Sequence, residues 1–254
     1  MKVALVLSIR EKSTRLPGKV LKELHEQTVT EHLIDRMKMA QNADMIVIGT
    51  SDDPRDAVFG TIAKKKGICV FFGDQDDKLL RYYQICNHFN LDGVVIVDGD
   101  DILCFPEIMN KNVELMKNGI DEVIFWRNLP LGAASSALSK KALEKVLELK
   151  AESDTEVWGG YFLNSDKFKV RIMDFDDPIL NHPEIRMTLD YQEDFDFLRC
   201  IFDDLCTHNK QFTSFDLMKY IVNDNPKLIE MTNGAQLKYE EHIKNAKPVR
   251  FKQI

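Results

Sequence analysis

Four cationic side chains gather near the start of the chain, in residues 8–19. The segment also holds three hydroxyl groups and a Pro-Gly pair, and it reads Ser8-Ile9-Arg10-Glu11-Lys12-Ser13-Thr14-Arg15-Leu16-Pro17-Gly18-Lys19. It follows the apolar run of residues 3–7, which predicts a strand buried on both faces. Because Pro-Gly favours a turn, we expect the cations on a loop where that strand ends. A basic loop in this position suits the binding of a polyphosphate.

A group of carboxylates follows a second apolar run. Residues 93–97 predict another strand, and Asp98-Gly99-Asp100-Asp101 comes directly after it. Carboxylates on a glycine-containing turn suit a hard divalent ion such as Mg²⁺, which bridges phosphate oxygens. Either cluster alone is more typical of a solvated surface loop. Brought together, the two clusters predict a nucleotide site.

The elements that would bring them together alternate along the first hundred residues. Strands are predicted at residues 3–7, 44–50, 68–72 and 93–97, and helices at 29–43, 54–66 and 76–89. This alternation predicts an α/β fold with a doubly wound, mostly parallel sheet and helices on both faces. In such sheets the ligand lies beyond the carboxyl ends of the strands, commonly between the first and the fourth. The basic loop and the carboxylates are therefore expected to be neighbours.

Composition narrows the class of protein. The chain has 254 residues and a net charge of −7, so nucleic acid is an unfavourable partner and the basic loop is a local exception. No apolar run is long enough to span a membrane, and the first residues lack the pattern of a secretory leader. Five cysteines without a C-x-x-C pair favour reduced thiols. We expect a cytoplasmic protein that binds neither nucleic acid nor membrane.

The second half of the chain adds further elements. A fifth strand is predicted at residues 122–126, and helices are predicted at 139–149, 191–206 and 214–222. The six histidines form no H-E-x-x-H pattern, and we assign no zinc. From residue 233 onward the chain is polar and locally basic, which favours an exposed arm with one short helix. The alternative is an arm that covers the active site of a neighbour in a dimer.

Several of these segments match a known family. Residues 13–21, Ser-Thr-Arg-Leu-Pro-Gly-Lys-Val-Leu, closely resemble the S-x-R-L-P-G-K-x-L signature of cytidylyltransferases that make CMP-linked acidic sugars, including the CMP-KDO and CMP-sialic acid synthetases. The resemblance is closest to the branch called spore coat polysaccharide biosynthesis protein F-like. It extends over about residues 1–206 through the segments at 73–82, 99–101, 129–132 and 188–194. It implies a GT-A-like nucleotidyltransferase (Rossmann-like) fold.

The resemblance also implies roles for individual residues. Those that would hold the nucleotide CTP are Arg10, Ser13, Arg15, Lys19, Arg81 and Asp98. Those that would take part in catalysis are Lys19, Arg10 and Asp100, and the Mg²⁺ ligands would be Asp100 and Asp190. The implied reaction is nucleotidyl transfer, in which an acceptor oxygen attacks the α-phosphate and pyrophosphate leaves. Such a reaction needs positioning and electrostatics more than a covalent nucleophile.

The acceptor is where the chain departs from the family. Residues 155–161, Thr-Glu-Val-Trp-Gly-Gly-Tyr, stand where relatives tend to have an Arg-Glu-His group. We therefore expect a small anionic acceptor, either an acidic sugar or a phosphorylated or phosphonylated molecule, in surface polysaccharide biosynthesis. Glu156 and Trp158 are the candidate acceptor-binding residues. The expected organisation is one nucleotidyltransferase domain, residues 1–230, in which a central insertion, 128–185, forms the acceptor site and the contact of a homodimer. Residues 231–254 would be a C-terminal arm.

Two other function classes stay open from the sequence. Asp98-Gly99-Asp100 is literally a D-x-D motif, as in GT-A glycosyltransferases, although those enzymes do not need the Arg15-to-Lys19 segment. A non-catalytic nucleotide-binding homologue is the other alternative. It would be expected to lack a metal carboxylate or Lys19, and this chain retains all of them.

Overall fold

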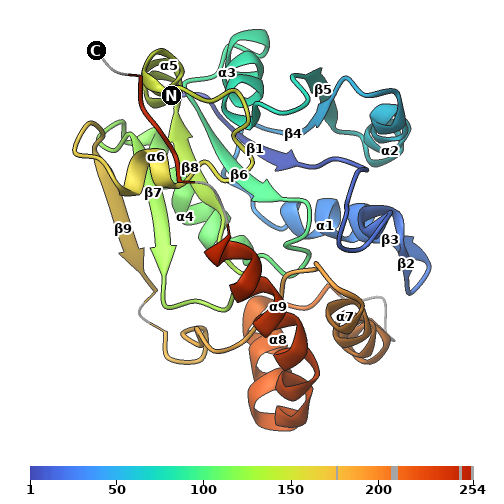
Figure 1. The fold of residues 1–254 in the computed structure, drawn as a ribbon. Coiled ribbons are helices and arrows are strands. Elements are labelled where there is room, and N and C mark those ends of the chain that lie inside the picture. Colours follow the sequence, from blue (N-terminus) through green and yellow to red (C-terminus); the bar gives the residue numbers. More distant parts are fainter. Residues whose placement is uncertain (176, 207–210, 246–247, 253–254) are drawn as a thin grey trace.

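A seven-stranded sheet forms the centre of the molecule (Figure 1). The computed structural model describes residues 1–175, 177–206, 211–245 and 248–252. The strand order is β5-β4-β1-β6-β8-β7-β9. The strands are β1 (Val3–Ser8), β4 (Met45–Ser51), β5 (Cys69–Gly73), β6 (Gly93–Asp98), β7 (Val123–Arg127), β8 (Ser136–Ser139) and β9 (Val170–Asp174). A small hairpin, β2 (Glu23–Leu24) and β3 (Gln27–Thr28), lies outside this sheet.

The sheet is mostly parallel, as the alternating pattern predicts. β5, β4, β1 and β6 are mutually parallel, and β7 and β9 are parallel to each other. Only β8 is antiparallel to its neighbours β6 and β7. All five predicted strands are present, whereas β8 and β9 escape the sequence analysis because neither is an unbroken apolar run: they read Ser-Ala-Leu-Ser and Val-Arg-Ile-Met-Asp. The α/β fold class is confirmed.

Helices connect the strands. Their bounds are α1 (Val29–Met37), α2 (Val58–Lys66), α3 (Lys78–His88), α4 (Pro106–Lys117), α5 (Lys140–Leu149), α6 (Gly160–Leu163), α7 (Gln192–Leu205), α8 (Ser214–Lys219) and α9 (Asn233–Lys244). Short helical turns occur at Lys19–Leu21, Pro54–Ala57, Tyr220–Asp224 and Pro226–Thr232. The predicted helix 29–43 is too long. It ends at Met37, and the backbone N–H groups of Gln41 and Asn42 turn to donate to the side chain of Asn110.

Both faces of the sheet are covered. Side chains of β1 alternate between the faces: Leu5 and Leu7 belong to a core shared with α1, α2, α4 and α7, while Ala4 and Val6 belong to a second core with α3, α5 and α6. The strand is therefore buried on both sides, as its unbroken apolar run predicts. No helix among the described residues is long and apolar enough to cross a membrane.

The topology brings two strand ends together. β1 and β6 pair directly, with Ser8 opposite Asp98, and the N–H of Gly99 donates to the carbonyl of Ser8 at 2.8 Å. The predicted adjacency of the first and fourth strands is confirmed. The proposed central insertion, residues 128–185, contributes β8 and β9 to the same sheet. Its residue 176, and residues 246–247 and 253–254 of the proposed arm, lie outside the described residues.

Candidate active site

Lys19 lies at the meeting point of two distant carboxylates. Its Nζ is 2.9 Å from Oδ2 of Asp100 and 2.9 Å from Oδ1 of Asp190, and it also donates to the carbonyl of Leu189 at 2.6 Å. The lysine is buried, with 8% of its surface exposed. Asp100 follows β6 and Asp190 precedes α7. The fold thus gathers three of the predicted site residues around one point.

Local structure fixes Lys19 in this position. Gly18 adopts a left-handed conformation, with φ of 65°, and begins the short helical turn that carries Lys19. The N–H of Lys19 donates to the carbonyl of Leu16 at 3.1 Å. Leu16 and Val20 are buried in the core on either side. The basic loop is therefore anchored by apolar side chains while its cations face the cavity described below.

Asp190 is held by a buried ion network. Arg186 donates through Nη2 to Asp190 at 3.2 Å and through Nε to Asp194 at 2.8 Å. Asp194 also accepts from the backbone N–H groups of Asp190 and Tyr191, at 2.8 and 2.9 Å. The N–H of Leu189 donates to the carbonyl of Asp100, which ties the two carboxylate segments together. A carboxylate fixed by this many bonds has one defined orientation.

The charges around Lys19 reinforce one another. Burial alone would lower the pKa of the lysine, but attraction to Asp100 and Asp190 outweighs burial and raises it. Burial alone would raise the pKa of Asp100, and the nearby Lys19 lowers it instead. Arg15 adds a second cation, with Nη2 at 2.7 Å from Asp190. Both predicted metal carboxylates are thus paired with cations.

A cavity of about 320 Å³ opens beside this cluster. Of the predicted site residues, those that line it are Arg10, Ser13, Arg15, Lys19, Arg81, Asp98, Asp100 and Glu156. The wall combines the loop after β1, the loop after β6, the start of α3 and the segment at residues 154–156. Asp190 is not part of the lining, but its carboxylate is bonded to Arg15 and Lys19, which are. The cavity is therefore strongly cationic on its β1 side.

The opposite wall carries a second charged group. Nη2 of Arg10 is 2.5 Å from Glu156, and Nζ of Lys78 is 3.0 Å from the same carboxylate and 3.6 Å from Asp98. Burial alone would raise the pKa of Glu156, but Lys78 and Arg10 lower it. Lys78 was missed by the sequence analysis. The available signal was its place in the family-like segment 73–82, directly after the helix-capping Asp77.

Arg81 carries unmatched donors. Its side chain is fully buried, and Nη1 donates to the carbonyl of Asp74 at 3.0 Å. Nε and Nη2 have no hydrogen-bond partner in the part of the chain that the structure describes. Burial and the nearby Arg10 lower the pKa of this guanidinium. Because buried polar groups are costly when unpaired, two free donors beside a cavity indicate a ligand acceptor.

Trp158 is not brought into the cavity. The side chain is 7% exposed and stacks on Phe125, with ring centroids 5.8 Å apart. Its edge contacts involve Tyr82 at 6.3 Å and Phe162 at 5.9 Å. Trp158 packs in the core between β7, α3 and α6, so of the two candidate acceptor residues only Glu156 reaches the cavity.

The donor set suits a divalent metal ion that is bound together with a phosphate. Within residues 1–175, 177–206, 211–245 and 248–252, no three His, Cys, Asp or Glu side chains form a ready-made metal cage. Mg²⁺ is usually bound by one or two carboxylates together with substrate phosphates. Asp100 and Asp190 supply two carboxylate oxygens that converge on the same lysine nitrogen. The side chains present are therefore suited to an ion that arrives with a polyphosphate.

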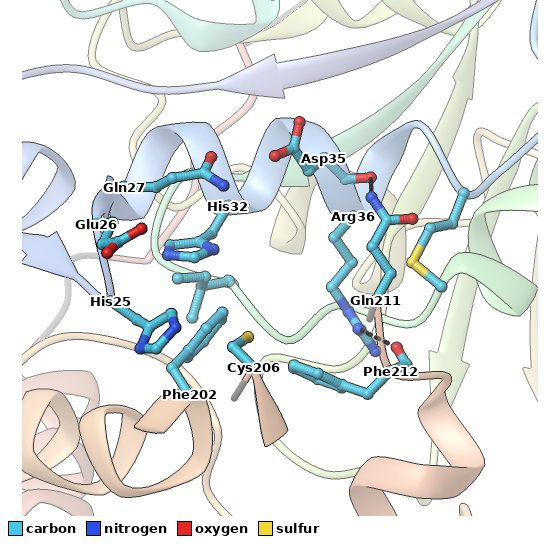
Figure 2. A pocket seen from close by; sticks show the side chains of 12 residues that line it. His25, Glu26, Gln27, His32, Asp35, Arg36, Phe202, Cys206, Gln211 and Phe212 are labelled. Atoms are coloured by element: carbon cyan, nitrogen blue, oxygen red, sulfur yellow. Dashed lines mark hydrogen bonds between the residues drawn. The ribbon is translucent and has the colours of Figure 1, made fainter. Parts of the chain in front are cut away.

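A second cavity, of about 340 Å³, lies between α1, the β2–β3 hairpin and α7 (Figure 2). Its wall includes His25, His32, Arg36, Phe202 and Phe212, and none of the predicted site residues. Arg36 donates to the backbone carbonyls of Cys104 and Phe212, and His32 is bonded to the carbonyl of Leu24. These polar groups are engaged in holding the scaffold.

Several known proteins are similar to this chain. A family model described as "Cytidylyltransferase" matches residues 3–225. The spore coat polysaccharide biosynthesis protein SpsF of Bacillus subtilis is 22% identical over 206 residues, which are 79% of this chain and 86% of that protein. A 3-deoxy-manno-octulosonate cytidylyltransferase of Aeromonas salmonicida is 25% identical over 167 residues, 64% of this chain and 61% of that protein.

Solved structures agree on the fold. A cytidylyltransferase from Leptospira borgpetersenii superposes with a TM-score of 0.81 and is 26% identical. The match covers 90% of this chain and 97% of that one. The nucleotidyltransferase type of fold that the motifs imply is thereby confirmed.

Proposed function

This chain belongs to the cytidylyltransferase family, as the motif at residues 13–21 predicts, and from this premise we propose that it transfers CMP from CTP to a small anionic acceptor. The reaction would depend on Mg²⁺ and release pyrophosphate. The acceptor class would be an acidic sugar or a phosphorylated or phosphonylated molecule. The likeness to a protein named for spore coat polysaccharide biosynthesis supports a role in making surface polysaccharides.

One observation carries the proposal: Lys19 lies 2.9 Å from both Asp100 and Asp190 at the edge of a cationic cavity. A nucleoside triphosphate with a divalent ion needs cations for its phosphates and carboxylates for its metal, at one place. Lys19 and Arg15 supply the first and the two aspartates supply the second. Arg10 and Ser13 extend the phosphate-binding surface along the same loop.

In the proposed reaction, an acceptor oxygen forms a bond to the α-phosphorus of CTP while the bond between that phosphorus and the bridging oxygen breaks. Pyrophosphate leaves with the electron pair. A phosphate, phosphonate or carboxylate oxygen attacks as an anion, whereas a sugar hydroxyl would release its proton to solvent. A bound Mg²⁺ would neutralise phosphate charge as it develops.

The side chains of this chain position the reactants. Lys19 and Arg15 would exchange part of their pairing with Asp190 for phosphate oxygens, which leaves the carboxylates available to the ion. Arg81 would donate its unmatched Nε and Nη2 to the nucleotide. Glu156 and Lys78, which form an ion pair, would face the acceptor. Fixed charges of this kind lower the barrier because they need no reorganisation during the reaction.

The test is pyrophosphate release from each of the four nucleoside triphosphates with Mg²⁺. The acceptor panel contains acidic sugars and small phosphate or phosphonate compounds. We expect a strong preference for CTP and release that requires an acceptor. Lys19→Ala and Asp100→Ala should each lower turnover by about 100-fold or more, with an unchanged circular dichroism spectrum.

A different product would contradict the proposal. Release of a nucleoside diphosphate from a sugar nucleotide would favour the glycosyltransferase class. Retained binding of CTP with no turnover over the whole panel would favour the non-catalytic class. Family membership speaks for the first class, and no observation in the cavity favours either alternative. Removal of Mg²⁺ by a chelator should abolish turnover reversibly.

The chain is also proposed to act as a homodimer. Residues 128–185 would supply the contact, and the same region carries Glu156 in the cavity. The division into a domain at residues 1–230 and an arm at 231–254 remains a prediction. In the described part of that arm, helix α9 is the principal element.

A further inference from the structure

Helix α9 reaches the cavity from beyond the region that the family shares. The family match ends at residue 225, and α9 spans Asn233–Lys244. His242 of this helix nevertheless lines the same cavity as Arg15 and Lys19. The helix, red in Figure 1, packs against α7, and the segment just before α7 holds Asp190. The chain therefore covers part of its own candidate site with an element of its own.

The contacts of α9 are directed at the segment that holds Asp190. Lys238 is 2.5 Å from Glu193, and Gln236 accepts from Arg186 at 3.5 Å. The guanidinium of Arg186 lies 5.0 Å from the ring centre of Tyr239. Since Arg186 also binds Asp190, α9 and the proposed metal carboxylate share one anchor.

One face of α9 points toward the site. Ala235, Tyr239 and His242 are spaced by four and three residues, so they lie on the same side of a helix. Ala235 is fully buried, and burial together with Asp190 raises the pKa of the Tyr239 phenol. Leu237, on another side, is 69% exposed. Few apolar groups hold the helix, so its place depends on the polar contacts around Arg186.

The phosphate side of the cavity is the side that α9 adjoins. The ring of Tyr191 lies 5.9 Å from the guanidinium of Arg15 and 5.4 Å from Nζ of Lys238. Arg15 in turn contacts Asp190. The second charged group, Glu156 with Lys78, forms the other wall. His242 is exposed and its imidazole has no hydrogen bond or ion pair in the described part of the chain, so both ring nitrogens are free.

We propose that α9 completes the nucleotide site, with the imidazole of His242 donating a hydrogen bond to a phosphate oxygen of the bound polyphosphate and Tyr239 holding the helix on Arg186. The inference rests on the proposed function for the identity of the nucleotide. It assigns the triphosphate a contact outside the family motifs. In this structure the helix reaches the cavity of its own chain.

The experiment measures the affinity of two probes by calorimetry, CTP and inorganic tripolyphosphate, each with Mg²⁺. The variants are His242→Ala and, as a matched control, Lys244→Ala. Lys244 is also a basic residue of α9, but it lies two residues on, about 200° around the helix, and outside the cavity lining. We expect His242→Ala to weaken both probes by about tenfold, the value of one hydrogen bond to a charged group. Lys244→Ala should change affinity less than about twofold.

Equal effects of the two variants would overturn the proposal, because they would indicate only a general loss of positive charge. Binding of tripolyphosphate without binding of CTP would refute the cytidylyltransferase proposal, and the affinity for tripolyphosphate would still test the role of His242. Binding of neither probe would refute both.

A double-mutant cycle tests the role of Tyr239. In a Tyr239→Ala background the helix should lose its anchor, and His242→Ala should then have almost no further effect on affinity. Additive effects would show that Tyr239 does not position His242. Thermal unfolding of each variant checks that the fold is retained.

Discussion

Arg81 is the residue whose surroundings most clearly call for a ligand. The Arg81 guanidinium is fully buried, and its Nε and Nη2 have no hydrogen-bond partner among the described residues. The desolvation of these donors is unfavourable, and a bound acceptor would compensate for it. Tyr82, the next residue in α3, donates instead to Ser8 at 2.6 Å and is fully satisfied. The contrast within one helix distinguishes Arg81, a candidate binding side chain, from Tyr82, which holds the scaffold.

Replacement of Arg81 by lysine tests this distinction. Arg81→Lys keeps the charge but removes the fork of donors, so we expect the KM for CTP to rise by about tenfold and kcat to change by less than about threefold. Arg55→Lys is the control, because that arginine is paired with Asp53 outside the cavity. Steady-state kinetics with varied CTP gives both constants. An unchanged KM would show that Nε and Nη2 have no role in binding.

At the scale of elements, Gly132 allows the close packing of the loop segment that leads to Asp190. Its φ is 94°, and a Cβ there would lie 2.7 Å from the backbone nitrogen of Thr188 and 3.0 Å from the carbonyl carbon of Met187. The N–H of Leu131 donates to Ile185 and the N–H of Met187 donates to Leu131. The loop after β7 and the segment before α7 are thus packed backbone to backbone.

Gly132→Ala should disturb both stability and activity. The methyl group meets backbone atoms that cannot rotate away, so we expect a loss of about 2 kcal/mol in the free energy of unfolding and a displaced Asp190 with reduced turnover. Gly67→Ala is the matched control. Gly67 also has positive φ, of 64°, but has no atom within 4 Å of the added carbon and lies at the end of α2. It should lose stability without losing activity, as urea unfolding and the pyrophosphate assay would reveal.

The cap at the start of α1 contributes to stability in a pH-dependent way through Glu31. Burial would raise the pKa of Glu31, but hydrogen bonds from Lys65 and Thr28 lower it from 4.5 to about 2. The charged form therefore stabilises the fold above about pH 4.5, and this contribution is lost as the pH falls toward 2. Thr28 and Glu31 form a reciprocal capping box.

Glu31→Gln should lower the free energy of unfolding by about 1 kcal/mol at pH 7. The difference from the wild type should shrink between pH 5 and pH 3, as urea unfolding at each pH would measure. Glu230→Gln, at an exposed position outside α1, is the control variant. A difference that stays constant over this range would show that the low pKa of Glu31 is not linked to folding.

The sequence predicts most strands and helices, but it does not predict the partners of individual side chains. Apolar runs with a period of two or 3.6 predict β1, β4, β5, β6 and the helices between them, because these patterns are local. The meeting of Lys19 with Asp100 follows from the strand-order rule for parallel sheets. Lys78 and Arg186 were not predicted, since a charged residue in a helix or loop looks the same whether it faces solvent or a buried carboxylate. The sequence likewise does not show whether the aromatic side chain of Trp158 faces the cavity or the core, where it packs.

At the scale of the whole molecule, the cavity depends on five segments that are far apart in the chain. The loops after β1 and β6, the start of α3, residues 154–156 and the end of α9 each contribute side chains. Only the first two follow from local patterns and sheet topology. The positions of the other three segments depend on tertiary packing, which the hydrophobic periodicity of a single sequence does not reveal. The contributions of α3, residues 154–156 and α9 to the cavity wall are therefore what the structure adds.

The edge of the sheet offers a test of the proposed dimer. β9 is a terminal strand, and a strand at an edge exposes unpaired backbone groups. Its Ile172 is 51% exposed, and Val157 and Leu163, in the same region of residues 128–185, are 51% and 52% exposed. Exposed apolar groups beside an open edge favour association with a second copy.

Ile172→Lys should therefore weaken self-association by about tenfold or more, because dimer formation would bury the added charge. Ile120→Lys is the control, since Ile120 is 65% exposed and lies outside residues 128–185. Sedimentation velocity over a range of concentrations measures both variants. If the wild type is a monomer at the concentrations used for the activity assay, the dimer proposal fails. In that case Arg10, Lys19 and α9 of one chain would have to suffice for catalysis, and turnover per chain should not depend on protein concentration.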